Sequence, residues 1–156
     1  MNILDTIGGI LIGLVVLAGS AIAVYAGYNY VKLSNMEQNT VSMRMNIQQL
    51  FSGASDYTGL SNTVAQTAGI VPLQFIKGAS LQNPYGGAIT LAAGANNTFT
   101  ISVDTIPQDA CTKLSLFQSD AWTGVSVNGT DVTGGTVATV AASCNAGSNA
   151  IVFTAK

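Results

Sequence analysis

The sequence contains no histidine, only two cysteines and very little charge. Of its 156 residues 8% are charged, against roughly 25% in an ordinary soluble protein. Five basic and seven acidic residues give a net charge of −2, without any basic run. Such a chain lacks the electrostatic footprint of a protein that binds nucleic acid or anionic lipid directly.

The same absences argue against an enzyme. Without histidine, a nucleophilic serine would need an unusual base, and the sequence contains no Ser-Lys spacing, nucleophile elbow or phosphate-binding glycine loop. Without a CxxC motif, thiol-redox and zinc chemistry are also disfavoured. Four aspartates could meet in space but suit loops and helix caps better: Asp104, Asp109, Asp120 and Asp131. We predict no catalytic residue, no metal and no cofactor.

A long apolar segment begins directly after Asp5. The 26 residues from Thr6 to Val31 carry no charge, and about 20 such residues cross a bilayer as a helix. The start "MNIL" has no basic residue, and the segment continues into helical patterning, unlike a cleaved signal peptide. We predict a membrane stem over residues 1–31 and a globular domain over residues 32–156.

The cysteines and the basic residues indicate on which side of the membrane the domain lies. Lys32 and Arg44 follow the apolar segment, so either the domain is cytoplasmic or a basic leader was removed before Met1. Cys111 and Cys144 predict a disulfide made in an oxidising compartment, the alternative being two free buried thiols. The disulfide favours a domain outside the cytoplasm, and therefore a removed leader.

Periodicity predicts an α+β domain on one long helix. Apolar positions spaced by three and four, interrupted by one threonine, predict that this helix continues to about Phe51: Leu33, Met36, Thr40, Met43, Ile47 and Leu50. Gly53 is expected in the left-handed position after its end. Further along we expect a short helix that is capped near Ser61 or Asn62 and ends before Gly69 or Pro72, and then a hairpin that turns at 94–97. A helix with Pro107 at its first position follows, and then a strand that turns at Asn128-Gly129. The segment "TVATVAASC" suits helix or strand, and "NAIVFTA" is expected to be a final strand.

Two local motifs have ordinary explanations beside functional ones. Gly9 and Gly13 form a GxxxG motif that lets membrane helices approach closely, although small residues are common in such helices. Asn96 and Asn128 match glycosylation sequons, but turn chemistry already accounts for both.

Together these features resemble the type IVb pilins. The resemblance rests on the acid at the fifth position, the two-part helix, "NPYGG", "ISVDTIPQDAC" and the late second cysteine. It is strongest to the major pilins of conjugative-plasmid thin pili and more remote to the toxin-coregulated pilin. It implies the type IV pilin fold in a Gram-negative bacterium, with a leader cut by a prepilin peptidase and Met1 N-methylated.

The resemblance also implies a mode of assembly. Monomers would wait in the inner membrane and be extracted by an assembly machine into a helical filament whose core is made of the stems. The family's acid, normally Glu, is taken to pair with the terminal amine of a neighbour, here Asp5 with Met1. The usual mid-stem proline is absent, which leaves Gly13, Gly19 and Ser20 as breakpoints.

We therefore predict a major pilin, the main subunit of an extracellular pilus for attachment or mating-pair stabilisation in conjugation. Its partners would be further copies of itself, the assembly machinery, and a recipient or host cell surface, without direct nucleic acid contact. The alternatives are a minor pilin or a type II secretion pseudopilin, and more weakly a membrane-anchored periplasmic binding domain.

Overall fold

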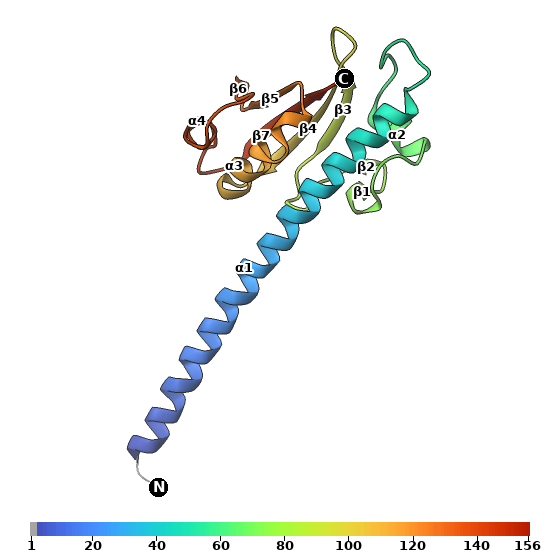
Figure 1. Ribbon diagram of the computed structural model, residues 1–156. Helices are drawn as coiled ribbons and strands as arrows, with labels where there is room; N and C mark the ends of the chain where they lie inside the picture. The colour runs from blue at the N-terminus through green and yellow to red at the C-terminus, as the bar shows by residue number, and fades with distance from the viewer. Residues whose placement is uncertain (1–2) are drawn as a thin grey trace. The chain divides into compact units, whose positions relative to one another are not determined.

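A computed structural model of the protein describes the backbone of residues 3–156 and the side chains of residues 24–156. Helix α1, Ile3–Leu50, is continuous over its 48 residues (Figure 1). The chain divides into two compact units, Met1–Ser34 and Asn35–Lys156. The second unit contains the last four turns of α1 and every other element.

The elements after α1 alternate short helices with strands. In chain order they are α2 Asn62–Thr67, η1 Leu73–Phe75, β1 Ile76–Lys77, β2 Ser80–Leu81, β3 Ile89–Ala93, β4 Phe99–Ile106, α3 Gln108–Leu116, η2 Ser119–Ala121, β5 Gly124–Val127, β6 Thr130–Asp131, α4 Val137–Ser143 and β7 Asn149–Ala155.

The main sheet has five antiparallel strands in the order β3-β4-β7-β5-β6. The C-terminal strand β7 is central, because Ile151 lies opposite Val103 of β4 and Val127 of β5. Along β7 buried residues alternate with half-buried ones, so one face of the sheet forms the core. The short strands β1 and β2 form a separate hairpin.

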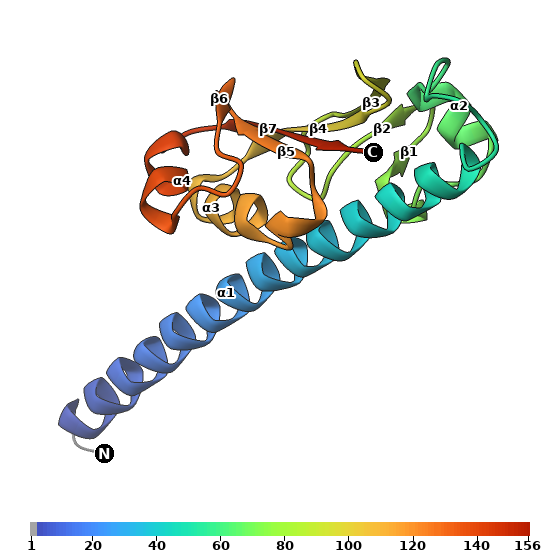
Figure 2. The ribbon, with the colours of Figure 1, turned by 45° about the horizontal axis from the view of Figure 1, so that its top comes forward.

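The last four turns of α1, which belong to the second unit, cover the apolar face of this sheet. Met36, Met43 and Ile47 are fully buried and Thr40 is nearly so, as the predicted stripe requires. Leu50 at the end of the stripe is exposed. Figure 2 shows α3 on the same side of the sheet as this part of α1, and α3 packs against β5, β7 and α4.

The predicted elements are present, with two corrections and one open alternative decided. Gly53 does not adopt the left-handed conformation, because the chain leaves α1 through successive short turns, among them Ser52 N–H to the Gln49 carbonyl and Ala54 N–H to the Phe51 carbonyl. Pro107 is the extended N-cap of α3, so the first helical residue is Gln108. The ambiguous "TVATVAASC" forms a helix, capped by the Thr136 hydroxyl.

The "NPYGG" motif forms a hydrogen-bonded turn between β2 and β3, which we call the NPYGG bracket. The buried Asn83 side chain donates to the Asp104 carbonyl and accepts from the backbone N–H groups of Tyr85 and Gly87. A Cβ on Gly87 would lie 1.9 Å from the Asp104 carbonyl oxygen. The motif therefore needs glycine at position 87 for close backbone approach.

We predict that Gly87→Ala strongly destabilises the domain, because the added methyl group meets backbone that cannot move aside without disturbing β4. The expected loss in the free energy of unfolding is on the order of 1–3 kcal/mol, as for other overpacked sites. Gly53→Ala is the matched control, since its Cβ meets nothing within 4 Å. Equal thermal unfolding midpoints for the two variants would contradict the bracket.

Candidate assembly surface

The exposed apolar side chains of α1 are the first candidate for subunit contact. In the unit Met1–Ser34, five such side chains occur within eight residues, with exposed fractions of 72% for Val24, 70% for Tyr25, 59% for Tyr28, 74% for Tyr30 and 54% for Val31. A concentration of exposed apolar side chains of this kind marks interaction sites. Across residues 24–156, where side chains are described, no helix is long and apolar enough to cross a membrane.

The site residues predicted in the stem all precede Val24. The side chains of Asp5, Gly13, Gly19 and Ser20 fall outside the described side chains, and Met1 falls outside the described residues altogether. Their roles in assembly, flexibility and N-methylation therefore remain predictions.

Arg44 fastens α1 to the segment between α3 and β5. Its guanidinium donates to the Ala121 carbonyl and lies 5.2 Å from the centre of the Trp122 ring. Trp122 in turn packs on Phe153 of β7, with ring centres 4.8 Å apart. Nothing local in the sequence points to this contact, because Arg44 and Ala121 are 77 positions apart.

A small polar cluster lies between α1, α3 and the NPYGG bracket. Burial, with the negative charges of Asp109 and Glu37, raises the pKa of Tyr85 to about 12. Burial also raises the pKa of the Glu37 carboxyl, against the opposing effect of Lys113. A tyrosine phenol is already neutral at physiological pH, and the raised pKa of Tyr85 disfavours the phenolate further, which suits packing rather than nucleophilic chemistry.

The predicted disulfide is present. Cys111 on α3 is joined to Cys144 after α4, with an S–S distance of 2.06 Å. Both cysteines are buried, and the Gln108 side chain donates to the Cys144 carbonyl at 3.0 Å. The disulfide thus ties the α3–α4 pair together beside the sheet.

Asn149 holds the same region from the sheet side. Its buried side-chain oxygen accepts from the Asn128 amide at 2.9 Å and from the Asn145 backbone N–H at 2.6 Å. Its amide nitrogen donates to the carbonyls of Ile106 and Asn145, each at 3.0 Å. Since all of its hydrogen-bonding capacity is used, Asn149 joins β7 to the end of β4, the β5–β6 turn and the segment after Cys144.

Asn62 covers the free edge of the main sheet. Its side chain donates to the Ile89 carbonyl and accepts from the Leu91 N–H, both at 2.8 Å, as a neighbouring strand would. Exposed strand edges invite pairing with other chains. This contact leaves less of the β3 edge open to such pairing when subunits are crowded together.

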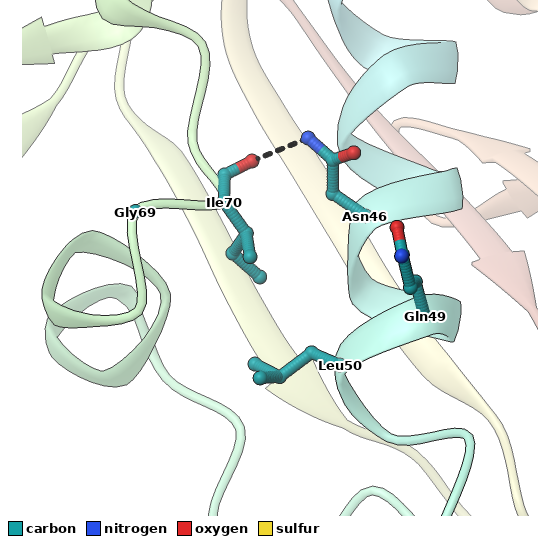
Figure 3. Close-up of a pocket in the computed structure, with 5 residues that line it drawn as sticks. All are labelled: Asn46, Gln49, Leu50, Gly69 and Ile70. Atoms are coloured by element: carbon teal, nitrogen blue, oxygen red, sulfur yellow. Dashed lines mark hydrogen bonds between the residues drawn. The ribbon is translucent and has the colours of Figure 1, made fainter.

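A shallow groove lies between the end of α1 and the loop after α2. Its volume is about 270 Å³, and it is lined by Asn46, Gln49, Leu50, Gly69 and Ile70. Figure 3 shows the Asn46 amide bonded to the Ile70 carbonyl, at 2.9 Å, across its upper end. Its volume lies just below the range of about 300–1,000 Å³ that is typical of small-molecule sites.

The four candidate aspartates are dispersed over different elements: Asp104 on β4, Asp109 on α3, Asp120 on η2 and Asp131 on β6. Hydrogen bonds from Thr133 lower the pKa of Asp131, as a local turn explains. Within the part of the chain that the structure describes, no group of three His, Cys, Asp or Glu side chains could hold a metal ion. Asn96 and Asn128 both adopt the left-handed conformation of their turns.

The fold is that of a type IV pilin. The crystal structure of TcpA, a type IV pilin from Vibrio cholerae El Tor biotype, matches with a TM-score of 0.57 and 15% identity, covering 80% of this chain and 99% of that chain. The profile of the PilS N terminal family matches residues 31–156, so the chain belongs to this family and is a type IVb pilin. A search of curated proteins finds no match.

Family membership identifies a structural pilus subunit rather than an enzyme. It implies a homo-oligomeric filament outside the cell.

We predict that replacing Cys111 and Cys144 together by serine lowers the free energy of unfolding by roughly 3–4 kcal/mol, as the chain-entropy model gives for a loop of this length. Such a loss is a large share of a small domain's stability, so filaments should cease to accumulate. Urea unfolding and electron microscopy of sheared material measure the two effects. Ser148→Ala, an exposed change beside the same region, should alter neither, and two free thiols in intact filaments would contradict the prediction.

Proposed function

We propose that this chain is the major subunit of a type IVb pilus, which polymerises through its N-terminal helix and serves in attachment or in stabilising mating pairs during conjugation. The observation that carries this proposal is the uneven burial of α1. Its buried stripe begins at Met36, whereas the described residues before it expose five large apolar side chains. An apolar helix surface that its own chain leaves largely exposed calls for neighbours.

The surface of the domain also suits a subunit present in many copies. Charged residues are few, and Asn, Gly and Thr dominate the loops. The outward face of the sheet carries hydroxyl side chains, such as Thr100, Ser102 and Thr154, which are half-buried. Such a surface packs against copies of itself without the repulsion that like charges would produce.

The stem has two environments in this proposal. Residues 1–31 cross the inner membrane before assembly and then form the filament core, while residues 32–156 form the pilin domain. A prepilin peptidase removes the leader, Met1 is N-methylated, and the assembly machinery extracts the subunit. In lipid the helix stays intact, because unpaired backbone groups cost several kcal/mol each. In the filament, neighbours can satisfy those groups, so the stem unwinds around Gly13, Gly19 and Ser20.

Asp5 is the proposed assembly contact. A carboxylate in the first turn of a helix gains roughly 0.3–1 kcal/mol from the helix dipole, which explains tolerance of an acid but not a need for one. If Asp5 meets the ammonium group of Met1 on an adjacent subunit, two charges that are each costly in an apolar core offset each other. The pair would then favour the one packing register that joins them.

Copy number tests the proposal of a major pilin against the alternatives. Cells that express the chain are sheared, and the released filaments are analysed by gel electrophoresis and mass spectrometry. We expect this chain to be the dominant protein of long filaments. Trace amounts would instead indicate a minor pilin or a type II secretion pseudopilin. Plasmid transfer frequency in liquid is then compared between cells with and without this chain, and a lower frequency without it would indicate a role in mating rather than in attachment.

We predict that Asp5→Ala leaves the monomer in the membrane with its domain folded, but stops polymerisation. Breaking such a buried pair costs on the order of 3–5 kcal/mol. Asp5→Glu should assemble at least as well as the original chain, and Thr6→Ala is the matched neutral control. Filament yield by electron microscopy is compared with the amount of monomer in the membrane fraction. Normal filaments from Asp5→Ala would contradict the prediction and leave Asp5 only its interaction with the helix dipole.

A further inference from the structure

Three of the chain's five tyrosines lie within six residues of α1, and all three are exposed: Tyr25, Tyr28 and Tyr30. We call these three residues the tyrosine belt. The other two tyrosines, Tyr57 and Tyr85, are half-buried in the domain. Among the other exposed large apolar side chains of residues 24–156, Val24 and Val31 flank the belt, whereas Met45, Leu50, Val64, Leu73 and Val137 are spread over the rest of the chain. The belt is thus a local concentration of tyrosine between two exposed valines.

We propose that the tyrosine belt binds the headgroup layer of a phospholipid bilayer and fixes the depth at which the subunit sits before assembly. This inference rests on the proposed membrane stem. Tyrosine combines an apolar ring with a polar tip, which suits the boundary between hydrocarbon and water. A helix surface made only for hydrocarbon would need no hydroxyl groups.

The position of the belt matches the thickness of a bilayer. From Asp5 to Tyr25 the helix advances 20 residues, which at about 1.5 Å per residue is ~30 Å, the thickness of the hydrocarbon core. With the Asp5 carboxylate at one interface, the belt therefore falls at the other. The next charge, Lys32, follows directly, and its ammonium lies 4.4 Å from the centre of the Tyr28 ring.

The distribution around the helix favours lipid over a single partner protein. At about 100° per residue, Tyr25 and Tyr28 lie about 60° apart, whereas Tyr30 lies on the opposite side from Tyr28. A medium that surrounds the helix contacts all three side chains, but one neighbouring helix contacts a single stripe. One lysine is too little charge for electrostatic lipid binding, so the tyrosine side chains supply the attachment.

The test measures depth in vesicles of equimolar phosphatidylethanolamine and phosphatidylglycerol, using the full-length protein. Gly27→Cys carries a nitroxide, attached after the native disulfide has formed, because a Cβ at Gly27 meets nothing within 4 Å. The depth of the label is read by electron paramagnetic resonance from its relative accessibility to oxygen and to a water-soluble nickel complex. The belt is then changed to three leucines or, as the matched control, to three tryptophans.

We expect the label in the wild-type background at headgroup depth, unchanged in the tryptophan variant. In the leucine variant it should move about 5 Å, or one helical turn, toward the hydrocarbon core, because leucine extends the apolar length without a polar tip. An unchanged depth in the leucine variant would overturn the inference, and loss of its filaments at unchanged depth would assign the belt to subunit contact. Failure of the wild-type chain to float with vesicles would instead refute the membrane stem itself.

Discussion

The burial of one stripe of α1 against the sheet is the constraint on which the rest of the domain depends. The sheet has one apolar face, and Met36, Met43 and Ile47 cover part of it. Burial of each such side chain contributes on the order of 1.5–3 kcal/mol, and α3 lies on the same side of the sheet. The stripe uses only the last turns of the helix, so the earlier turns remain available for a membrane and for other subunits.

Side-chain amides organise this domain where many proteins use charges. Asn83 brackets a turn, Asn62 covers a sheet edge and Asn149 joins four segments. An amide both donates and accepts, so one residue can satisfy backbone N–H and C=O groups together without the cost of burying a charge. This accounts physically for a stable domain in which few residues are charged, and it leaves the surface neutral enough to pack against copies of itself.

Contacts between distant segments were beyond the reach of sequence reasoning. The long helix, the hairpin at 94–97 and the turn at Asn128-Gly129 follow from local patterns, and the structure contains them. The contacts of Arg44 with Ala121 and of Asn149 with Ile106 have no local signature, because they join residues 77 and 43 positions apart. The sequence does not predict the groove at Leu50 and Ile70 either, because the groove forms only where α1 and the loop after α2 lie side by side.

Some properties of this pilin follow from its sequence alone. Periodicity specifies which face of α1 is buried, because each side chain favours either water or the core according to its own polarity. The number and setting of the cysteines indicate the disulfide, because thiols oxidise in pairs in an oxidising compartment. Tertiary structure decided the rest. It made "TVATVAASC" a helix, since α4 packs against α3 beside the disulfide, and it placed β7 at the centre of the sheet. Strand order depends on which distant segments bury each other best, a balance summed over the whole fold that no local pattern records.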